Sequence, residues 1–314
     1  MPQSIALLSL VIGSSLASSL FFVLSARILR EAAGNTPPST VGVVGLTHLS
    51  ASLFLLPFLP TVGVSSVSDL GELASPAVWT LILVTVVLHL AARFFHFKAL
   101  SLIDVSLVSP FAALTPVLTV ATAWLILAER PSLVELMGIF IVVISLLGLT
   151  GAPDALRAHL GTRRLNRDTV VRAGLWFAFL SAIPPAFKIA VQKKAILLSS
   201  PFTYALLILL LTGLGASAFC ILRYRAQELR AQFPLRRLRA FFLISSLLAL
   251  NTLLFCAALT LGIAAGVSAM ARISIVFQGI LAYWIAGQKT DFRRRILWAV
   301  AIFVGTLVIA IANP

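Results

Sequence analysis

Ionisable side chains far from the ends of apolar segments are the residues of this chain best suited to do chemistry. His89, Arg93 and His96 are spaced i, i+4 and i+7, which places all three on one face of a helix. Lys188, Arg272 and His48 lie within three other apolar segments. A charge at the centre of a bilayer costs about 3 kcal/mol on insertion scales. We therefore expect these groups to face a cavity rather than lipid.

All of these groups are cations or can become cations, whereas Asp104, Glu129 and Glu135 lie at the ends of apolar segments. A cavity that contains such cations attracts a carboxylate, a phosphate or the acid end of a zwitterion. Asn and Gln residues inside the second half add neutral hydrogen-bonding groups. The predicted substrate-binding residues are Arg93, Lys188, Arg272, His89, His96, Asn251 and Gln278. His89 and His96 are also the candidates for proton coupling, because imidazole exchanges a proton near neutral pH.

Each of these residues also has a purely structural interpretation. Arg93 lies only about a turn and a half from the end of its segment, so its side chain could extend to the membrane surface, and the same holds for Lys188. Arg272 could instead pair with a backbone carbonyl freed elsewhere. A histidine alone is more often a structural hydrogen-bonding residue than a proton carrier. Substitution separates these interpretations: we expect Arg272→Ala to abolish anion transport while leaving folding intact, whereas loss of expression would indicate a structural role.

The elements that must position these residues are ten apolar segments. Hydrophobic residues make up 60% of the chain and charged residues 11%, against about 25% charged residues in soluble domains. Each segment is about as long as a bilayer requires, and the first is too long for the core of a signal peptide. The chain is predicted to be an all-α membrane protein. The predicted segments are 5–29, 40–60, 77–99, 104–128, 133–151, 173–198, 201–222, 240–262, 265–287 and 296–313.

The second half of the chain repeats the first at an offset of 159 residues. The sequence at 99–102, Ala-Leu-Ser-Leu, recurs at 258–261 as Ala-Leu-Thr-Leu. We predict a first five-helix repeat at 1–151, a polar, Arg-rich linker at 152–172 and a divergent second repeat at 173–314. Because five is an odd number, the two repeats enter the membrane from opposite sides. Such inverted repeats allow alternating access to a site between them.

The positive charge of the chain is distributed unevenly between the connections. Nineteen of the 24 Lys and Arg lie in the odd-numbered connections or the adjoining helix ends, and three lie at the even-numbered ones. This bias places the odd connections in the cytoplasm and both termini outside. It also explains the net charge of +14 without nucleic-acid binding. The two cysteines, Cys220 and Cys256, lie in apolar runs and support neither a disulfide framework nor a metal site.

Several motifs resemble the EamA-type repeat of the drug/metabolite transporter superfamily. They are the Leu-Thr-Pro-Val of 114–117, the Leu-Ala-Glu-Arg of 127–130, Gly138 and Gly148. The resemblance implies two five-helix repeats and export of amino acids, their relatives or other small metabolites. Ala128 stands where the family usually has glycine, and the second repeat has Gly287-Gln288 for the family's Gly-Glu pair and Ile275 for its proline. The family usually keeps both termini in the cytoplasm, opposite to the charge bias here.

Together these observations predict a secondary active transporter, an exporter or exchanger, of a small anionic or zwitterionic metabolite such as an amino acid or organic acid. The alternative is a transporter or flippase of a phosphorylated or lipid-linked substrate. A membrane enzyme or receptor has less support, because no nucleophile–base pair or acidic pair is found in the segments. The expected location is the bacterial cytoplasmic membrane. The expected partners are a small-molecule substrate and lipids, without nucleic acid or a cofactor, and a homodimer is compatible with the chain.

Overall fold

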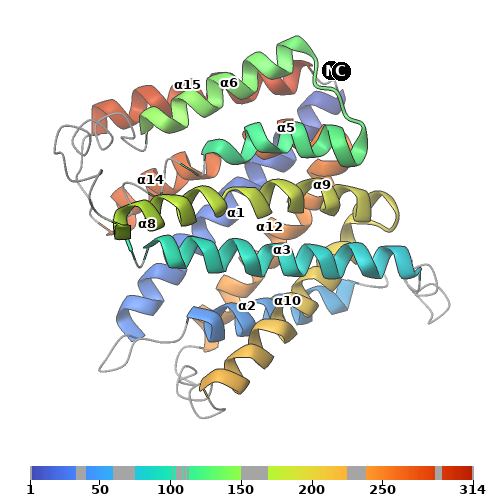
Figure 1. The fold of residues 1–314 in the computed structure, drawn as a ribbon, viewed down its shortest axis with the longest axis vertical. Helices are drawn as coiled ribbons and strands as arrows, with labels where there is room; N and C mark the ends of the chain where they lie inside the picture. Colours follow the sequence, from blue (N-terminus) through green and yellow to red (C-terminus); the bar gives the residue numbers. More distant parts are fainter. Residues whose placement is uncertain are drawn as a thin grey trace.

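The computed structural model is built from helices, and its described residues contain no strand (Figure 1). The described residues are 2–32, 40–58, 75–100, 102, 103, 108, 111, 113–149, 169–224, 238–286 and 292–312. The helices are α1 (Pro2–Ala32), α2 (Thr40–Leu55), α3 (Pro76–Leu100), α5 (Leu114–Leu127), α6 (Leu133–Leu149), α8 (Thr169–Leu180), α9 (Ile183–Leu197), α10 (Pro201–Tyr224), α12 (Leu238–Leu261), α13 (Ala264–Met270), α14 (Ile273–Ala286) and α15 (Phe292–Ala312).

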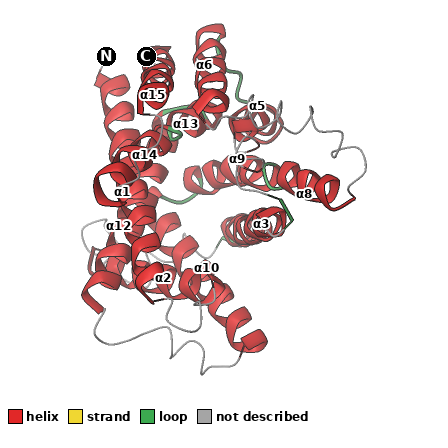
Figure 2. Cartoon of the chain, turned by 90° about the vertical axis from the view of Figure 1, so that its left-hand side faces the viewer, coloured by secondary structure: helices red, strands yellow, loops and turns green. Residues whose placement is uncertain are grey.

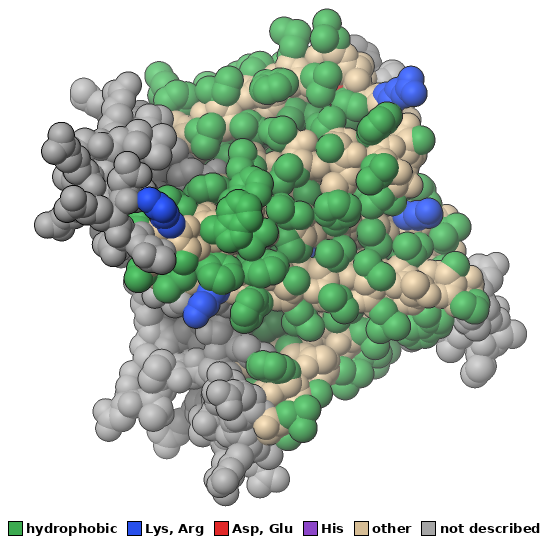
Figure 3. Space-filling view, viewed as in Figure 1, with side chains coloured by type: hydrophobic (Ala, Val, Ile, Leu, Met, Phe, Trp, Pro, Cys, Tyr) green, Lys and Arg blue, Asp and Glu red, His purple; other side chains and the backbone are tan. Residues whose placement is uncertain are grey.

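Length and hydropathy identify which helices can cross a bilayer. Five apolar spans are long enough, in α1, α3, the α8–α9 pair, α10 and α12. Five shorter apolar helices lie in α2, α5, α6, the α13–α14 pair and α15. The face seen in Figure 3 is dominated by hydrophobic side chains, and its Lys and Arg side chains lie toward the left and right margins. Such a band suits lipid contact, and the prediction of an all-α membrane protein is confirmed.

Two of the predicted segments are broken helices in the structure. The sixth is divided into α8 and α9 by a turn at residues 181–182, and Pro184 and Pro185 stand in the first turn of α9. Proline suits this position because the first helical N–H groups have no partner to lose. The ninth is divided into α13 and α14 by a turn at residues 271–272. Arg272 therefore lies at a helix break rather than inside a continuous helix.

The helices of the two halves pack in a pattern that is unchanged when the halves are exchanged. Helix α2 packs on α10, its counterpart in the second half, and α6 packs on α15. When the halves are exchanged, the contact between α1 and α12 becomes the contact of α3 with the α8–α9 pair. In the same way, the contact between α5 and α9 becomes the contact between α14 and α1. Helix α1 begins beside the end of α15 (Figures 1 and 2), as an even number of spans requires. Residues 152–168 of the predicted linker lie outside the described residues, so the domain limits stay a prediction.

Small residues allow α2 and α10 to approach closely. A Cβ atom added at Gly213 would lie 2.7 Å from the backbone nitrogen of Leu49 on α2, and one added at Gly45 would lie 2.8 Å from the backbone nitrogen of Ser217 on α10. Backbone atoms cannot move aside as a flexible side chain can. Both glycines therefore fix the distance between the two helices, in the manner of small residues at membrane helix crossings.

A pair of glycines on α10 tests this packing. We expect Gly213→Ala to lower the thermal stability of the purified protein, because α2 and α10 must separate to admit the methyl group; overpacking of this kind costs about 1–3 kcal/mol. Gly215→Ala is the matched control, since a Cβ atom there meets nothing within 4 Å and alanine is the better helix former by about 1 kcal/mol. The measurement is thermal unfolding in detergent. Equal melting temperatures for the two variants would contradict the role of Gly213.

Candidate functional site

A cavity of about 410 Å³ lies between the two halves of the chain. Its lining residues come from α1, α2 and α3 of the first half and from α9, α10 and α12 of the second. These six elements are three pairs of counterparts under the exchange of the halves. The volume is within the range of about 300–1,000 Å³ that small-molecule sites occupy.

The charged groups of the cavity are cations contributed by two neighbouring helices. Arg93 on α3 and Lys188 on α9 both line it, and α3 packs against α9. Lys188 Nζ lies 3.3 Å from Nδ1 of His89, one turn before Arg93. Among the described lining residues there is no Asp or Glu, and within the described ranges neither Arg93 nor Lys188 forms an ion pair. Two unneutralised cations at this depth make the cavity attractive to an anion.

The contact between Lys188 and His89 determines where the histidine carries its proton. A lysine ammonium group can only donate, so it donates to Nδ1 of His89 and the neutral ring carries its hydrogen on Nε2. That Nε2 atom is buried and has no hydrogen-bond partner in the described part of the chain. A buried donor without an acceptor costs about 1–3 kcal/mol. His89 therefore adds an unsatisfied donor to the two cations beside it.

Neutral polar groups from both halves complete the lining. Ser14 Oγ donates to Asn251 Oδ1 at 2.9 Å, which leaves the Asn251 amide nitrogen as a donor. The Nε2 group of Gln192 donates to Cys256 Sγ at 3.4 Å, which leaves the Gln192 oxygen as an acceptor. On α2, His48 donates from Nδ1 to the Val44 carbonyl oxygen at 2.7 Å, so its Nε2 accepts when the ring is neutral. The His48 and His89 ring centroids are 5.9 Å apart.

The structure brings four of the seven predicted binding residues to the cavity lining: Arg93, Lys188, His89 and Asn251. It does not place the other three there. His96 lies on α3 close to its end, Gln278 lies on α14, and Arg272 occupies the break between α13 and α14. The Nε atom of Arg272 is buried and has no partner among the described residues. Whether any of the seven binds substrate stays a prediction.

His48 and Gln192 also line the cavity but are not among the predicted binding residues. The sequence placed His48 inside the second segment, where it was noted as an isolated ionisable group. Gln192 follows Lys188 by four residues on α9, so it lies on the same helix face. The i, i+4 spacing from Lys188 could therefore have identified Gln192 as a cavity residue from the sequence. For His48 only the three-dimensional structure shows that its ring meets that of His89, with centroids 5.9 Å apart.

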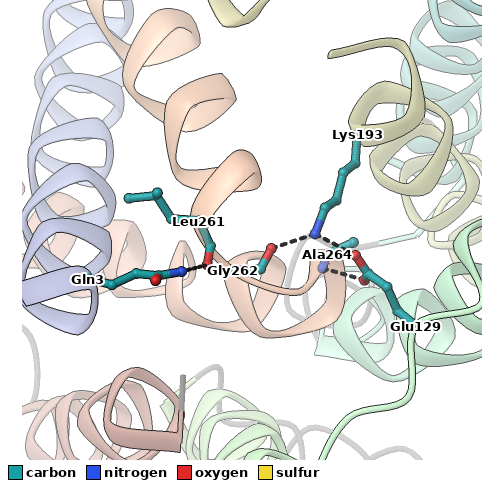
Figure 4. Close-up of polar contacts among 6 residues, drawn as sticks. All are labelled: Gln3, Glu129, Lys193, Leu261, Gly262 and Ala264. Carbon is teal, nitrogen blue, oxygen red and sulfur yellow. Dashed lines mark hydrogen bonds and ion pairs between the residues drawn. The ribbon is translucent and has the colours of Figure 1, made fainter. Parts of the chain in front are cut away.

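The end of the bundle at the even-numbered connections is closed by a polar cluster that we call the latch (Figure 4). Glu129, two residues after α5, forms an ion pair with Lys193 on α9. The Nζ group of Lys193 also donates to the carbonyl oxygen of Gly262 at 2.7 Å, and Glu129 Oε2 accepts from the backbone N–H of Ala264 at 2.7 Å. Gln3 Nε2 donates to the Leu261 carbonyl oxygen at 3.2 Å nearby.

Lys193, which the charge count assigns to the even-numbered connections and their adjoining helix ends, has its side chain inside the latch. Lys193 is buried on α9, whereas its neighbour Lys194 is exposed. The latch joins the end of α5 in the first half to α9 and to the α12–α13 junction in the second half. The latch therefore ties the two halves together at the end of the bundle opposite to the odd connections. The cavity residues of α1 and α3 lie near the other end, toward the odd connections.

Ala128, which precedes the latch glutamate, has a backbone conformation that glycine adopts more easily. It ends α5 with φ 55° and ψ 21°, in the left-handed region, and among the described residues it is the only non-glycine residue with positive φ. This conformation costs a side-chain-bearing residue about 1–2 kcal/mol. The family pattern that places glycine at this position has its physical reason here.

We expect Ala128→Gly to raise the free energy of unfolding by about 1 kcal/mol, because glycine removes this strain. Ala123→Gly is the control: Ala123 is buried inside α5, where glycine should destabilise by a similar amount. Thermal unfolding of both variants in the same detergent measures the two signs. A lower melting temperature for Ala128→Gly would contradict the strain argument.

Comparisons with known proteins give a family match for the first half of the chain and a fold match for both halves. Residues 6–151 match the model of the EamA-like transporter family. A crystal structure titled only "Crystal structure of protein" superimposes with a TM-score of 0.71 at 16% sequence identity, covering 98% of this chain and 97% of that one. At this identity the likeness shows the fold, over both halves of the chain. No curated protein matches the sequence.

Proposed function

We propose, on the premise that this chain belongs to the EamA-like transporter family through residues 6–151, that it is a secondary active transporter of a small anionic or zwitterionic metabolite. Membership of that family makes it a multi-pass membrane transporter of the drug/metabolite transporter superfamily. The proposal adds the substrate class, such as an organic acid or amino acid, and transport by alternating access as an exporter or exchanger. It also adds that residues 1–151 and 173–314 are inverted repeats.

The observation that carries the substrate class is the charge of the cavity. Arg93 and Lys188 line it without a carboxylate partner within the described ranges, and His89 presents an unsatisfied donor. Buried cations are retained in a membrane protein when a ligand supplies the opposite charge. A transporter of cations needs a buried carboxylate instead, and the described lining contains none.

Alternating access is supported by the positions of the cavity and the latch. The lining residues of α1, α2 and α3 lie toward the odd connections, at residues 21–25, 44–48 and 89–93. The latch ties the halves together at the even connections. A path between the halves that is closed at one end is the arrangement that inverted repeats exchange during transport. The charge bias of the connections supports an orientation with the odd side in the cytoplasm.

Transport by the purified chain in proteoliposomes tests the proposal. Uptake of labelled organic acids, amino acids and sugar phosphates is compared, with a lipophilic cation as the opposing class and protein-free liposomes as the blank. We expect saturable uptake of at least one anionic or zwitterionic compound. Uptake of the lipophilic cation alone would show that the substrate class is wrong, and uptake of a sugar phosphate alone would favour the phosphorylated alternative.

A further inference from the structure

The two faces of the cavity differ in chemistry, although they come from equivalent helices. The 159-residue offset aligns His89 with Leu248 and Arg93 with Thr252, and all four residues line the cavity. Helix α3 thus contributes a donor and a cation where α12 contributes an apolar and a neutral group. The cavity therefore has a cationic wall formed by Arg93 on α3 and Lys188 on α9, and an uncharged wall that includes α12.

Apolar side chains from α1 and α10 extend the uncharged wall. Phe21 and Phe22 line the cavity with ring centroids 5.2 Å apart, in edge-to-face contact. Ile208 and Leu209 line it from α10. A hydrocarbon or aromatic body placed against these side chains gains about 25 cal/mol for each Å² of apolar surface removed from water. The lining therefore fits a molecule with a charged end and an apolar end.

The described lining offers no negatively charged partner for an ammonium group. The acceptors left after internal hydrogen bonding are neutral, and they include the Gln192 side-chain oxygen and Nε2 of His48. Either can accept from a hydroxyl group of a ligand. An ammonium group there would have no carboxylate to neutralise it and would lie in a cavity that already contains Arg93 and Lys188. Like charges in a water-poor site repel each other strongly.

We propose that the cavity selects an amphipathic organic anion without an ammonium group, of the class of aromatic or branched 2-hydroxy acids, over the amino acid of the same skeleton. The carboxylate of the ligand pairs with Arg93 and Lys188, and its hydroxyl group donates to a neutral acceptor. Its apolar body packs against the uncharged wall. This inference rests on the proposed transport function and narrows its substrate class from anions and zwitterions to anions alone.

The test is a comparison of matched compounds with the full chain in proteoliposomes. 3-Phenyllactate and phenylalanine share one skeleton and differ in a hydroxyl or an ammonium group, and lactate lacks the phenyl ring. Counterflow of labelled phenyllactate is measured against increasing concentrations of each compound. We expect phenyllactate to half-saturate at a concentration about tenfold or more below those of phenylalanine and lactate.

A variant adds a second, independent readout. Thr252→Asp places a carboxylate at the position equivalent to Arg93 and should narrow or reverse the preference for phenyllactate; Thr260→Asp, exposed near the end of the same helix, should not. The comparison on the unmodified protein decides the matter if Thr252→Asp does not fold. Phenylalanine taken up as well as phenyllactate would overturn the inference and leave the proposed function standing. Uptake of the lipophilic cation alone would overturn both.

Discussion

Lys188→Met is expected to reduce transport of the anionic substrate by about 10- to 100-fold. The ammonium group of Lys188 lines the cavity and would form a charge-assisted hydrogen bond with the bound anion, which is worth about 1.5–3 kcal/mol. Each 1.4 kcal/mol corresponds to about tenfold in affinity. Initial rates in proteoliposomes over a range of substrate concentrations measure the effect, which should be greatest at low concentration.

The same variant should not destabilise the fold. Lys188 donates to Nδ1 of His89 but forms no ion pair in the described part of the chain, so its charge is a cost that the folded state carries. Methionine has a similar length and no charge, so it removes the cost of keeping an unneutralised cation away from water. We expect an unchanged or higher melting temperature together with the loss of transport.

Lys194→Met is the matched control for this substitution. Lys194 lies on the same helix but is exposed, so its replacement should leave transport and thermal stability nearly unchanged, as for most surface substitutions. If Lys188→Met transports normally, the anion does not bind at this cation. If it unfolds while Lys194→Met does not, Lys188 is a structural residue, and the substrate argument fails at that point.

The periodic and compositional features of the chain were predictable because each depends on nearby residues. Apolar runs of bilayer length gave the ten segments, and the helices of the structure lie within or close to them. The intramembrane positions of Arg93 and Lys188 followed in the same way. The i, i+4 and i+7 spacing predicted one cavity-lining face for His89, Arg93 and His96; His89 and Arg93 line the cavity, whereas His96 does not.

Features that depend on how segments meet were not accessible to the same reasoning. The break at Arg272 contains no proline or glycine, and only tertiary packing shows it: Ser15 Oγ on α1 donates to the Ala271 carbonyl oxygen at the break, at 3.4 Å. The ion pair of Glu129 with Lys193 joins residues 64 positions apart. Each stands near the end of a segment, where a solvated charge is the ordinary expectation. Sequence position alone therefore gave no sign that they meet.

Lys193→Met is expected to open the latch and shift the protein toward the conformation that is accessible from the even side. The substitution leaves the Glu129 carboxylate with the Ala264 N–H as its described partner and removes the hydrogen bond to the Gly262 carbonyl oxygen. Losing one partner of a buried ion pair costs about 3–5 kcal/mol. We use about 3 kcal/mol, the low end of that range, because the Lys193 and Glu129 side chains remain 11% and 14% exposed. Since the latch closes only one end, this cost falls on the conformation described here.

A cost of about 3 kcal/mol on one of two conformations changes their ratio by about 100-fold. A single cysteine in the cavity, Thr252→Cys in a Cys220→Ser/Cys256→Ser background, reports which side has access. A membrane-impermeant maleimide should label it from the odd side when the latch is intact. Adding Lys193→Met should raise the labelling rate from the even side by at least about tenfold, whereas Lys194→Met should not change it.

A double variant distinguishes a latch from a general loss of stability. Glu129→Gln keeps an oxygen acceptor for the Ala264 N–H and removes the charge that Lys193→Met leaves unpaired. The combination of Glu129→Gln with Lys193→Met should therefore recover part of the even-side closure, with a coupling energy that neither single variant explains. Two results would show that this ion pair does not hold the halves together. One is an even-side labelling rate that Lys193→Met leaves unchanged, and the other is a double variant that is labelled from the even side as fast as the single variant. The even end would then be closed by helix packing alone, and the asymmetry between the two ends of the cavity would need another cause.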